Sequence, residues 1–180
     1  MTKQAQDILH YNQTEYFLNQ EILKDYFRKY PKKRPENDFV SSAMWRGYIA
    51  EFQIRENQLY VLNKDYNLAD LFPDNGKLEW YSGLIRIDDF GGEFSEEPKN
   101  GIFEYLEILN GNLIRHRKFD YEELQTFKKE QFKYFLISDE IELVYEFWRK
   151  NNENGIINKD GVNKIIAERI MEYTKEVYAE

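Results

Sequence analysis

The chain has 180 residues, a net charge of −8, 17% aromatic residues and no cysteine. This length suits a single domain spanning 1–180, with one candidate subdivision into a β-rich core, 1–119, and a helical extension, 120–180. The absence of cysteine excludes disulfides, thiolate nucleophiles and metal sites with cysteine ligands.

The N-terminal region predicts a small hairpin followed by a helix. Apolar residues in 8–11 and 15–18 flank a polar turn, as in a two-stranded hairpin. Asn19 is a candidate helix cap, and apolar side chains then recur at helical spacing over 22–30. Pro31 ends this predicted helix.

The middle of the chain predicts β-strands. Alternation over 43–55 indicates one long strand, which we expect to pair with 59–62 through a tight turn at Glu56-Asn57. Another strand is expected at 78–87.

The clearest hairpin signal is Asn110-Gly111, which lies between strand candidates at 102–109 and 113–117. No long helix separates the predicted strands, as a parallel crossover would require. We therefore expect antiparallel pairing.

Helical spacing replaces strand alternation at Asp120. Asp120 and Glu123 have the spacing of a capping box, which predicts the start of a helix. Further helices are expected after 138–139 and after Asp160, each with an apolar stripe. The order of elements predicts an α+β fold: an antiparallel sheet of about six to seven strands with one N-terminal helix and a C-terminal group of about three helices, packed on the sheet or beside it.

Motifs that mark common enzyme classes do not occur in the sequence. The two histidines, His10 and His116, fall on separate predicted strands, and no zinc motif surrounds them. Serine-nucleophile elbows and glycine-rich phosphate loops are missing. The balance favours a protein that is not an enzyme and uses no cofactor, although carboxylate-based hydrolases carry no short motif and stay open.

An acidic, glycine-containing loop follows the strand at 78–87. Asp88, Asp89 and Glu93 are weak candidates for a hard-cation site, because Ca²⁺ and Mg²⁺ prefer carboxylate oxygens. The spacing matches no known ion loop, so we favour a solvated charged turn and expect no metal.

Arg46 lies between large aromatic residues, which leaves two interpretations of its role. It could anchor an acidic group of a ligand, or it could form an ion pair in the core, and we favour the ion pair. If Arg46 instead serves in binding a ligand or partner, the candidate binding residues are Trp45, Arg46, Tyr48, Trp80 and Arg86.

A basic cluster over 28–34 surrounds Tyr30 and Pro31. It could bind an anion or a nucleic-acid backbone. We favour a simpler role, because cations at a helix C-terminus complement the helix dipole and one isolated patch makes a poor polynucleotide track.

Four sequence blocks occur in a fixed order: Ser42-Ala43-Met44-Trp45-Arg46-Gly47-Tyr48, Leu59-Tyr60-Val61, Leu71-Phe72-Pro73 and Trp80-Tyr81-Ser82-Gly83-Leu84-Ile85-Arg86-Ile87. In these blocks the chain resembles an uncharacterised family of small bacterial proteins. The resemblance implies a β-rich bacterial domain and carries over no activity and no catalytic residue. It does not extend beyond Asp120.

The function expected from the sequence is a non-enzymatic protein-interaction module that binds through an aromatic and acidic face. An immunity or antidote protein in bacterial conflict is one concrete version. The alternative is a small-ligand-binding protein or carboxylate-based enzyme with a pocket around Arg46 and Arg86. No signal peptide or apolar run of about 20 residues is present, so we expect a cytoplasmic protein with a protein partner rather than a membrane or nucleic acid. The oligomeric state is left open.

Overall fold

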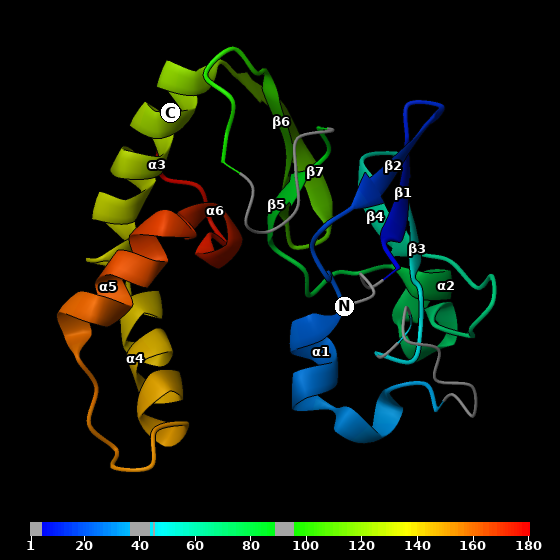
Figure 1. The fold of residues 1–180 in the computed structure, drawn as a ribbon. Helices are drawn as coiled ribbons and strands as arrows, with labels where there is room; N and C mark the ends of the chain where they lie inside the picture. Colours follow the sequence, from blue (N-terminus) through cyan, green and yellow to red (C-terminus); the bar gives the residue numbers. More distant parts are fainter. Residues whose placement is uncertain (1–4, 37–43, 45, 89–95) are drawn as a thin grey trace.

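The computed structural model describes residues 5–36, 44, 46–88 and 96–180. Its centre is a seven-stranded sheet with the order β2-β1-β3-β4-β7-β6-β5 (Figure 1). The strands are β1 (Asp7–Tyr11), β2 (Thr14–Leu18), β3 (Glu51–Arg55), β4 (Gln58–Val61), β5 (Gly83–Arg86), β6 (Phe103–Leu109) and β7 (Asn112–Phe119). Together with the helices, this sheet confirms the predicted α+β fold.

The helices gather mainly at the C-terminal end of the chain. They are α1 (Lys24–Lys29), α2 (Pro73–Gly76), α3 (Tyr121–Phe135), α4 (Glu140–Lys150), α5 (Lys159–Glu168) and α6 (Ile170–Tyr173), with short 3₁₀ turns η1 (Pro31–Lys33) and η2 (Ala69–Leu71). The predicted capping box is present, since the Asp120 carboxylate accepts the Glu123 N–H and the Glu123 carboxylate accepts the Asp120 N–H. Within the described ranges, every helix is too short or too polar to span a bilayer.

Three tight turns build the hairpins of the sheet. Each has two central residues with positive φ, the conformation of a type I′ turn: Asn12 and Gln13, Glu56 and Asn57, Asn110 and Gly111. At the last turn only glycine fits, because a Cβ on Gly111 would lie 2.7 Å from the Leu78 carbonyl oxygen. The turns predicted at Glu56-Asn57 and Asn110-Gly111 are confirmed.

Two apolar cores lie on opposite faces of β5 and β6. In β6, Leu106 and Ile108 face one core, whereas Phe103 and Tyr105 face the other, as strand alternation requires. The first core contains residues of both sheet halves and α1, among them Leu9, Phe27, Tyr48, Phe52, Leu59, Leu78 and Ile85. The second core joins the sheet to α3–α6 through Leu84, Phe119, Leu124, Phe127, Ile141, Tyr145, Ile166 and Ile170, among others. Figure 1 shows these helices on the side of β5 away from β1–β4.

Two of the predicted strands are too long. The strand predicted at 43–55 begins only at Glu51, because Gly47 has φ +87° and its N–H closes a turn onto the Met44 carbonyl at 2.9 Å. The strand predicted at 78–87 is confined to β5, because the Tyr81 N–H closes a turn onto the Leu78 carbonyl at 3.0 Å. Arg46 and Tyr48 therefore precede β3 and do not lie within the long strand that the alternation predicted.

Sheet pairing and two helix boundaries also differ from expectation. β1 and β3 are parallel, joined by the long excursion through α1, while the other strand pairs are antiparallel. Helix α1 starts at Lys24 rather than near Asn19, whose side-chain oxygen instead accepts a hydrogen bond from Gln6 at 2.8 Å. The last predicted helix is interrupted at Arg169, between α5 and α6.

Candidate functional site

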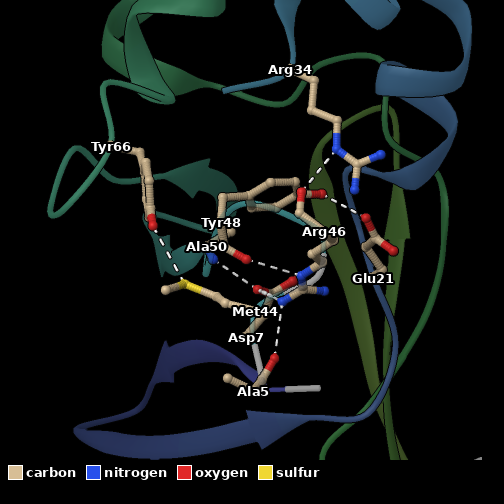
Figure 2. A network of polar contacts seen from close by, with 9 residues as sticks. All are labelled: Ala5, Asp7, Glu21, Arg34, Met44, Arg46, Tyr48, Ala50 and Tyr66. Atoms are coloured by element: carbon tan, nitrogen blue, oxygen red, sulfur yellow. Dashed lines mark hydrogen bonds and ion pairs between the residues drawn. The ribbon is translucent and has the colours of Figure 1, made fainter. Parts of the chain in front are cut away.

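Arg46 is buried and surrounded by acceptors from its own chain. Its Nε donates to the Tyr48 carbonyl at 3.0 Å, and one terminal nitrogen donates to the Ala5 carbonyl at 3.2 Å and to the Asp7 carboxylate (Figure 2). Both side chains of the ion pair are almost inaccessible to solvent. Of the two roles that the sequence allowed for Arg46, this geometry corresponds to the internal ion pair and not to a free anchor for a ligand.

Asp7 ties the first strand to the segment that precedes β3. Its Oδ1 accepts the Ala50 N–H at 2.7 Å as well as the Arg46 guanidinium. Its Oδ2 is buried and has no hydrogen-bond partner among the residues that the structure describes. Burial raises the pKa of Asp7 to about 6, against the opposing effect of Arg46. The pair therefore carries a desolvation cost that it only partly offsets.

Tyr48 is held on two sides within the first core. Its ring packs against Phe27, with centroids 5.2 Å apart, and the Arg46 guanidinium lies over it at 5.0 Å. Its hydroxyl donates to Glu21 at 2.7 Å (Figure 2). Burial and this hydrogen bond raise the pKa of Tyr48 above its ordinary range. Such a hydroxyl stays protonated and acts as a structural donor.

Arg86 lies elsewhere, at the second core. Its Nε lies 2.9 Å from both carboxylate oxygens of Asp88, and its guanidinium lies near the rings of Phe103 and Tyr105. Asp88 also accepts the Glu104 N–H at 3.0 Å. Arg46 and Arg86 thus bind separate carboxylates, and the two pairs share no residue.

The metal candidates receive no support from the described part of the chain. No group of three or more His, Asp or Glu side chains there could hold an ion. Asp89 and Glu93 lie outside the described residues, as does Trp45 among the binding candidates. The two histidines lie on strands as predicted, each paired with a glutamate: His10 with Glu51 at 3.1 Å and His116 with Glu104 at 2.7 Å.

Trp80 belongs to a cluster of stacked rings at the surface. It stacks on Tyr26 at a centroid distance of 5.6 Å and on Phe72 at 6.3 Å, with interplanar angles of 30° and 28°. Tyr26 also contacts Phe72 at 4.6 Å and Tyr30 at 5.0 Å. We call Tyr26, Tyr30, Phe72 and Trp80 the aromatic surface. Of these four residues Phe72 is buried, whereas Tyr30 and Trp80 are 40% and 38% exposed.

Lysines lie over two of these rings. The Lys33 ammonium is 5.1 Å from the Tyr30 ring centre and 5.7 Å from that of Tyr26, and it donates to the Tyr26 hydroxyl at 3.2 Å. The Lys29 ammonium lies 5.5 Å from the Tyr30 ring. Lys33 also lines a solvent-open hollow of about 360 Å³ beside this surface. The predicted basic cluster thus meets the predicted binding residue Trp80.

The structure divides the predicted site residues among three places. Arg46 and Tyr48 lie together in the first core, Arg86 lies at the second core, and Trp80 lies on the aromatic surface. Sequence reasoning missed Asp7 as the partner of Arg46, because 39 positions separate them. It also missed that Tyr26 and Tyr30 remain at the surface. Their spacing of four residues places them on one helix face, and the adjoining lysines indicated that this face is exposed.

Comparisons of this chain with family models, curated proteins and solved structures found no match.

Proposed function

We propose that this protein is a non-enzymatic protein-interaction module that binds its partner through the aromatic surface. The observation that carries the proposal is the position of Tyr30 and Trp80, which remain about two-fifths exposed although each packs against Tyr26. Tyrosine and tryptophan on a rigid support are typical of the residues that dominate binding energy at protein interfaces.

The local charge indicates the chemistry of the partner surface. The segment from Lys24 to Arg34 contains six basic residues and one acidic residue, Asp25, within a chain of net charge −8. Exposed lysines around the rings complement carboxylates, so the partner surface that fits is acidic and has an apolar side chain to set against Trp80. This proposal replaces the expectation of an acidic binding face, because the charged residues around these rings are mostly basic.

A protein partner fits this surface better than a nucleic acid. Single-stranded nucleic acids stack on open ring faces. Here Lys33 lies over the Tyr26 and Tyr30 rings, and Trp80 stacks on Tyr26 and Phe72. The net charge of −8 also repels a polyanion.

The alternative of an anionic-ligand pocket has less support. It requires guanidinium groups available to a ligand, whereas Arg46 and Arg86 each contact a carboxylate of the chain. No observation places the two arginines around one cavity.

Site-specific photo-crosslinking in cells of the source organism tests the proposal. A photoreactive phenylalanine replaces Tyr30 in one variant and Tyr134, which is 46% exposed on α3, in a matched control. We expect a protein adduct from position 30 only, lost on Trp80→Ala. With the partner purified, Trp80→Ala should weaken binding at least tenfold, as truncation of an interface anchor does. Equal crosslinking at both positions, or a nucleic-acid adduct, would overturn the proposal.

An immunity protein is the specific version of this proposal. It predicts that a neighbouring gene encodes a toxin and that co-expression of the present chain protects cells from it. Trp80→Ala should abolish protection while leaving the protein folded. A neighbouring toxin that still kills in the presence of the wild-type chain would remove this version and leave the general proposal in place.

A further inference from the structure

The two edges of the sheet are treated differently. At the β5 edge, the Gln20 side chain fills the place of a neighbouring strand: its amide nitrogen donates to the Leu84 carbonyl at 2.9 Å, and its oxygen accepts the Arg86 N–H at 2.9 Å. Helix α6 also lies against β5, where a Cβ on Gly83 would come within 3.4 Å of the Thr174 carbonyl oxygen. This edge is covered against further pairing.

The opposite edge is β2. The turn at Asn12 and Gln13 makes Tyr11 and Thr14 the first hydrogen-bonded pair of the hairpin, and hydrogen-bonded pairs then alternate along the register. Glu15 and Phe17 consequently direct their N–H and C=O groups away from β1. An observed bond agrees with this alternation of hydrogen-bonded pairs. Ile8 lies opposite Phe17, and its N–H points away from β2 and donates to the Ala50 carbonyl.

The outward groups of β2 are unused in the described structure. Among residues 5–36, 44, 46–88 and 96–180, no backbone or side-chain hydrogen bond is recorded for the outward N–H and C=O groups of Glu15 and Phe17. The side chains of both residues are exposed, and the Phe17 ring is 59% accessible to solvent. A strand edge with an exposed aromatic residue is a template for another strand.

We propose that β2 accepts an extended segment of a partner protein as an eighth strand of the sheet. Cross-strand neighbours share a face, so the segment would place an apolar side chain beside Phe17 and, two residues away, a cation beside Glu15. This site is separate from the aromatic surface and does not depend on the function proposed for it.

The charge of the β2 face favours a basic partner segment over a second copy of this chain. The Glu15 carboxylate is half exposed at this edge and lies 3.9 Å from His10. Glu51, the next carboxylate, lies on β3 and is already paired with Lys64 and His10. Each copy carries a net charge of −8, which opposes self-pairing at an edge that presents Glu15.

A synthetic peptide tests the inference. The probe is Thr-Lys-Thr-Ile-Thr-Lys-Thr-Ile, which places lysine and isoleucine alternately on one face, and its counterpart carries glutamate in place of lysine. In an amide NMR titration we expect the lysine peptide to shift the Glu15 and Phe17 signals and to protect their N–H groups from exchange. The glutamate peptide should bind at least tenfold more weakly.

Two variants at one position separate strand addition from simple charge attraction. Glu15→Gln removes the charge alone, whereas Glu15→Pro removes the outward N–H as well, without touching the bonds to β1. Strand addition therefore predicts that Glu15→Pro weakens the lysine peptide at least tenfold more than Glu15→Gln does. Glu15→Lys should invert the charge preference, so that the glutamate peptide binds better. If the proline variant does not fold, protection of the Glu15 and Phe17 amides in the wild type decides the test, because charge attraction alone does not protect them.

Matched controls fix where the peptide binds. Ile137→Lys changes an exposed apolar residue outside the sheet and should leave the affinity unchanged, whereas Phe17→Lys should reduce it at least tenfold. Trp80→Ala should also leave it unchanged, so this inference and the proposed function fail separately. Shifts confined to other residues, no shift at millimolar peptide, or a concentration-dependent dimer that protects the β2 amides would overturn the inference.

Discussion

Two buried polar side chains, Arg46 beside the first core and Gln131 beside the second, are satisfied in different ways. Beside the first core, a charged pair joins Asp7 to Arg46. Beside the second core, the neutral amide of Gln131 links α3 to the C-terminal segment. It is buried, donates to the Glu176 carbonyl and accepts the N–H groups of Tyr178 and Ala179. A buried charged pair makes stability sensitive to pH and to the loss of one partner. A buried amide does not titrate, and its loss leaves no unpaired charge.

The largest effect is expected when one member of the charged pair is removed. Arg46→Ala leaves the Asp7 carboxylate buried without its cation, which should lower the free energy of unfolding by about 3–5 kcal/mol. Urea denaturation at pH 7 measures this change. The double variant Asp7→Leu/Arg46→Met should cost less than Arg46→Ala alone, because no charge is then left unpaired. A double variant that is less stable than Arg46→Ala would contradict this account.

The pH dependence of stability next separates the Asp7–Arg46 pair from the Gln131 amide. Burial raises the pKa of Asp7 from its ordinary 3.8 to about 6, so the folded state binds the proton more tightly than the unfolded state. The contribution of this group to stability is therefore greatest below about pH 4 and is lost as the pH rises through about 6, a change on the order of 2–3 kcal/mol.

The measurement is the difference between wild type and Asp7→Asn, because other carboxylates act in the opposite sense. Burial opposes ionisation of Glu51, but hydrogen bonds from Lys64 and His10 outweigh it and lower its pKa. Urea midpoints from pH 4 to 7 should show the Asp7 contribution in the wild type and its absence in Asp7→Asn. Parallel curves for the two proteins would show that the Asp7 carboxyl titrates normally.

Loss of the neutral Gln131 amide gives a smaller effect that does not depend on pH, because the amide does not titrate. Gln131→Ala removes the acceptor for two N–H groups near the C-terminus, which should lower the free energy of unfolding by about 1–3 kcal/mol. Hydrogen exchange should accelerate at Tyr178 and Ala179. Gln125→Ala, six residues earlier on α3, is a control that leaves these amides protected.

The sequence predicted local features of this fold well, because they depend on neighbouring residues. The Asn110-Gly111 turn and the Asp120 capping box both form where expected. The apolar stripes of α4 and α5 also pack as predicted, with Ile141, Tyr145, Val162 and Ile166 buried. Each of these features needs contacts within a few residues, which spacing alone reveals.

The candidate site was less predictable, because it depends on distant partners. Strand alternation placed Arg46 in a regular strand, but its bond to Asp7 draws it into a turn before β3. Likewise, Trp80 leaves the predicted strand to stack on Tyr26, which is 54 positions earlier in the chain. Such a pairing is fixed by the tertiary fold, and a single sequence carries no record of it.

The smallest effect is expected at the covered sheet edge. Gln20→Ala removes two partly buried hydrogen bonds to β5, which should lower the free energy of unfolding by about 1–2 kcal/mol. The informative measurement is hydrogen exchange at Arg86, whose N–H loses the Gln20 oxygen as its acceptor and should exchange faster. Gln20→Glu keeps the acceptor for that N–H while removing the donor to Leu84, so Arg86 should stay protected in this variant although stability still falls. If both variants left the exchange of Arg86 unchanged, helix α6 rather than Gln20 would be what covers the β5 edge, and the contrast with the open β2 edge would rest on packing instead of on a side-chain amide.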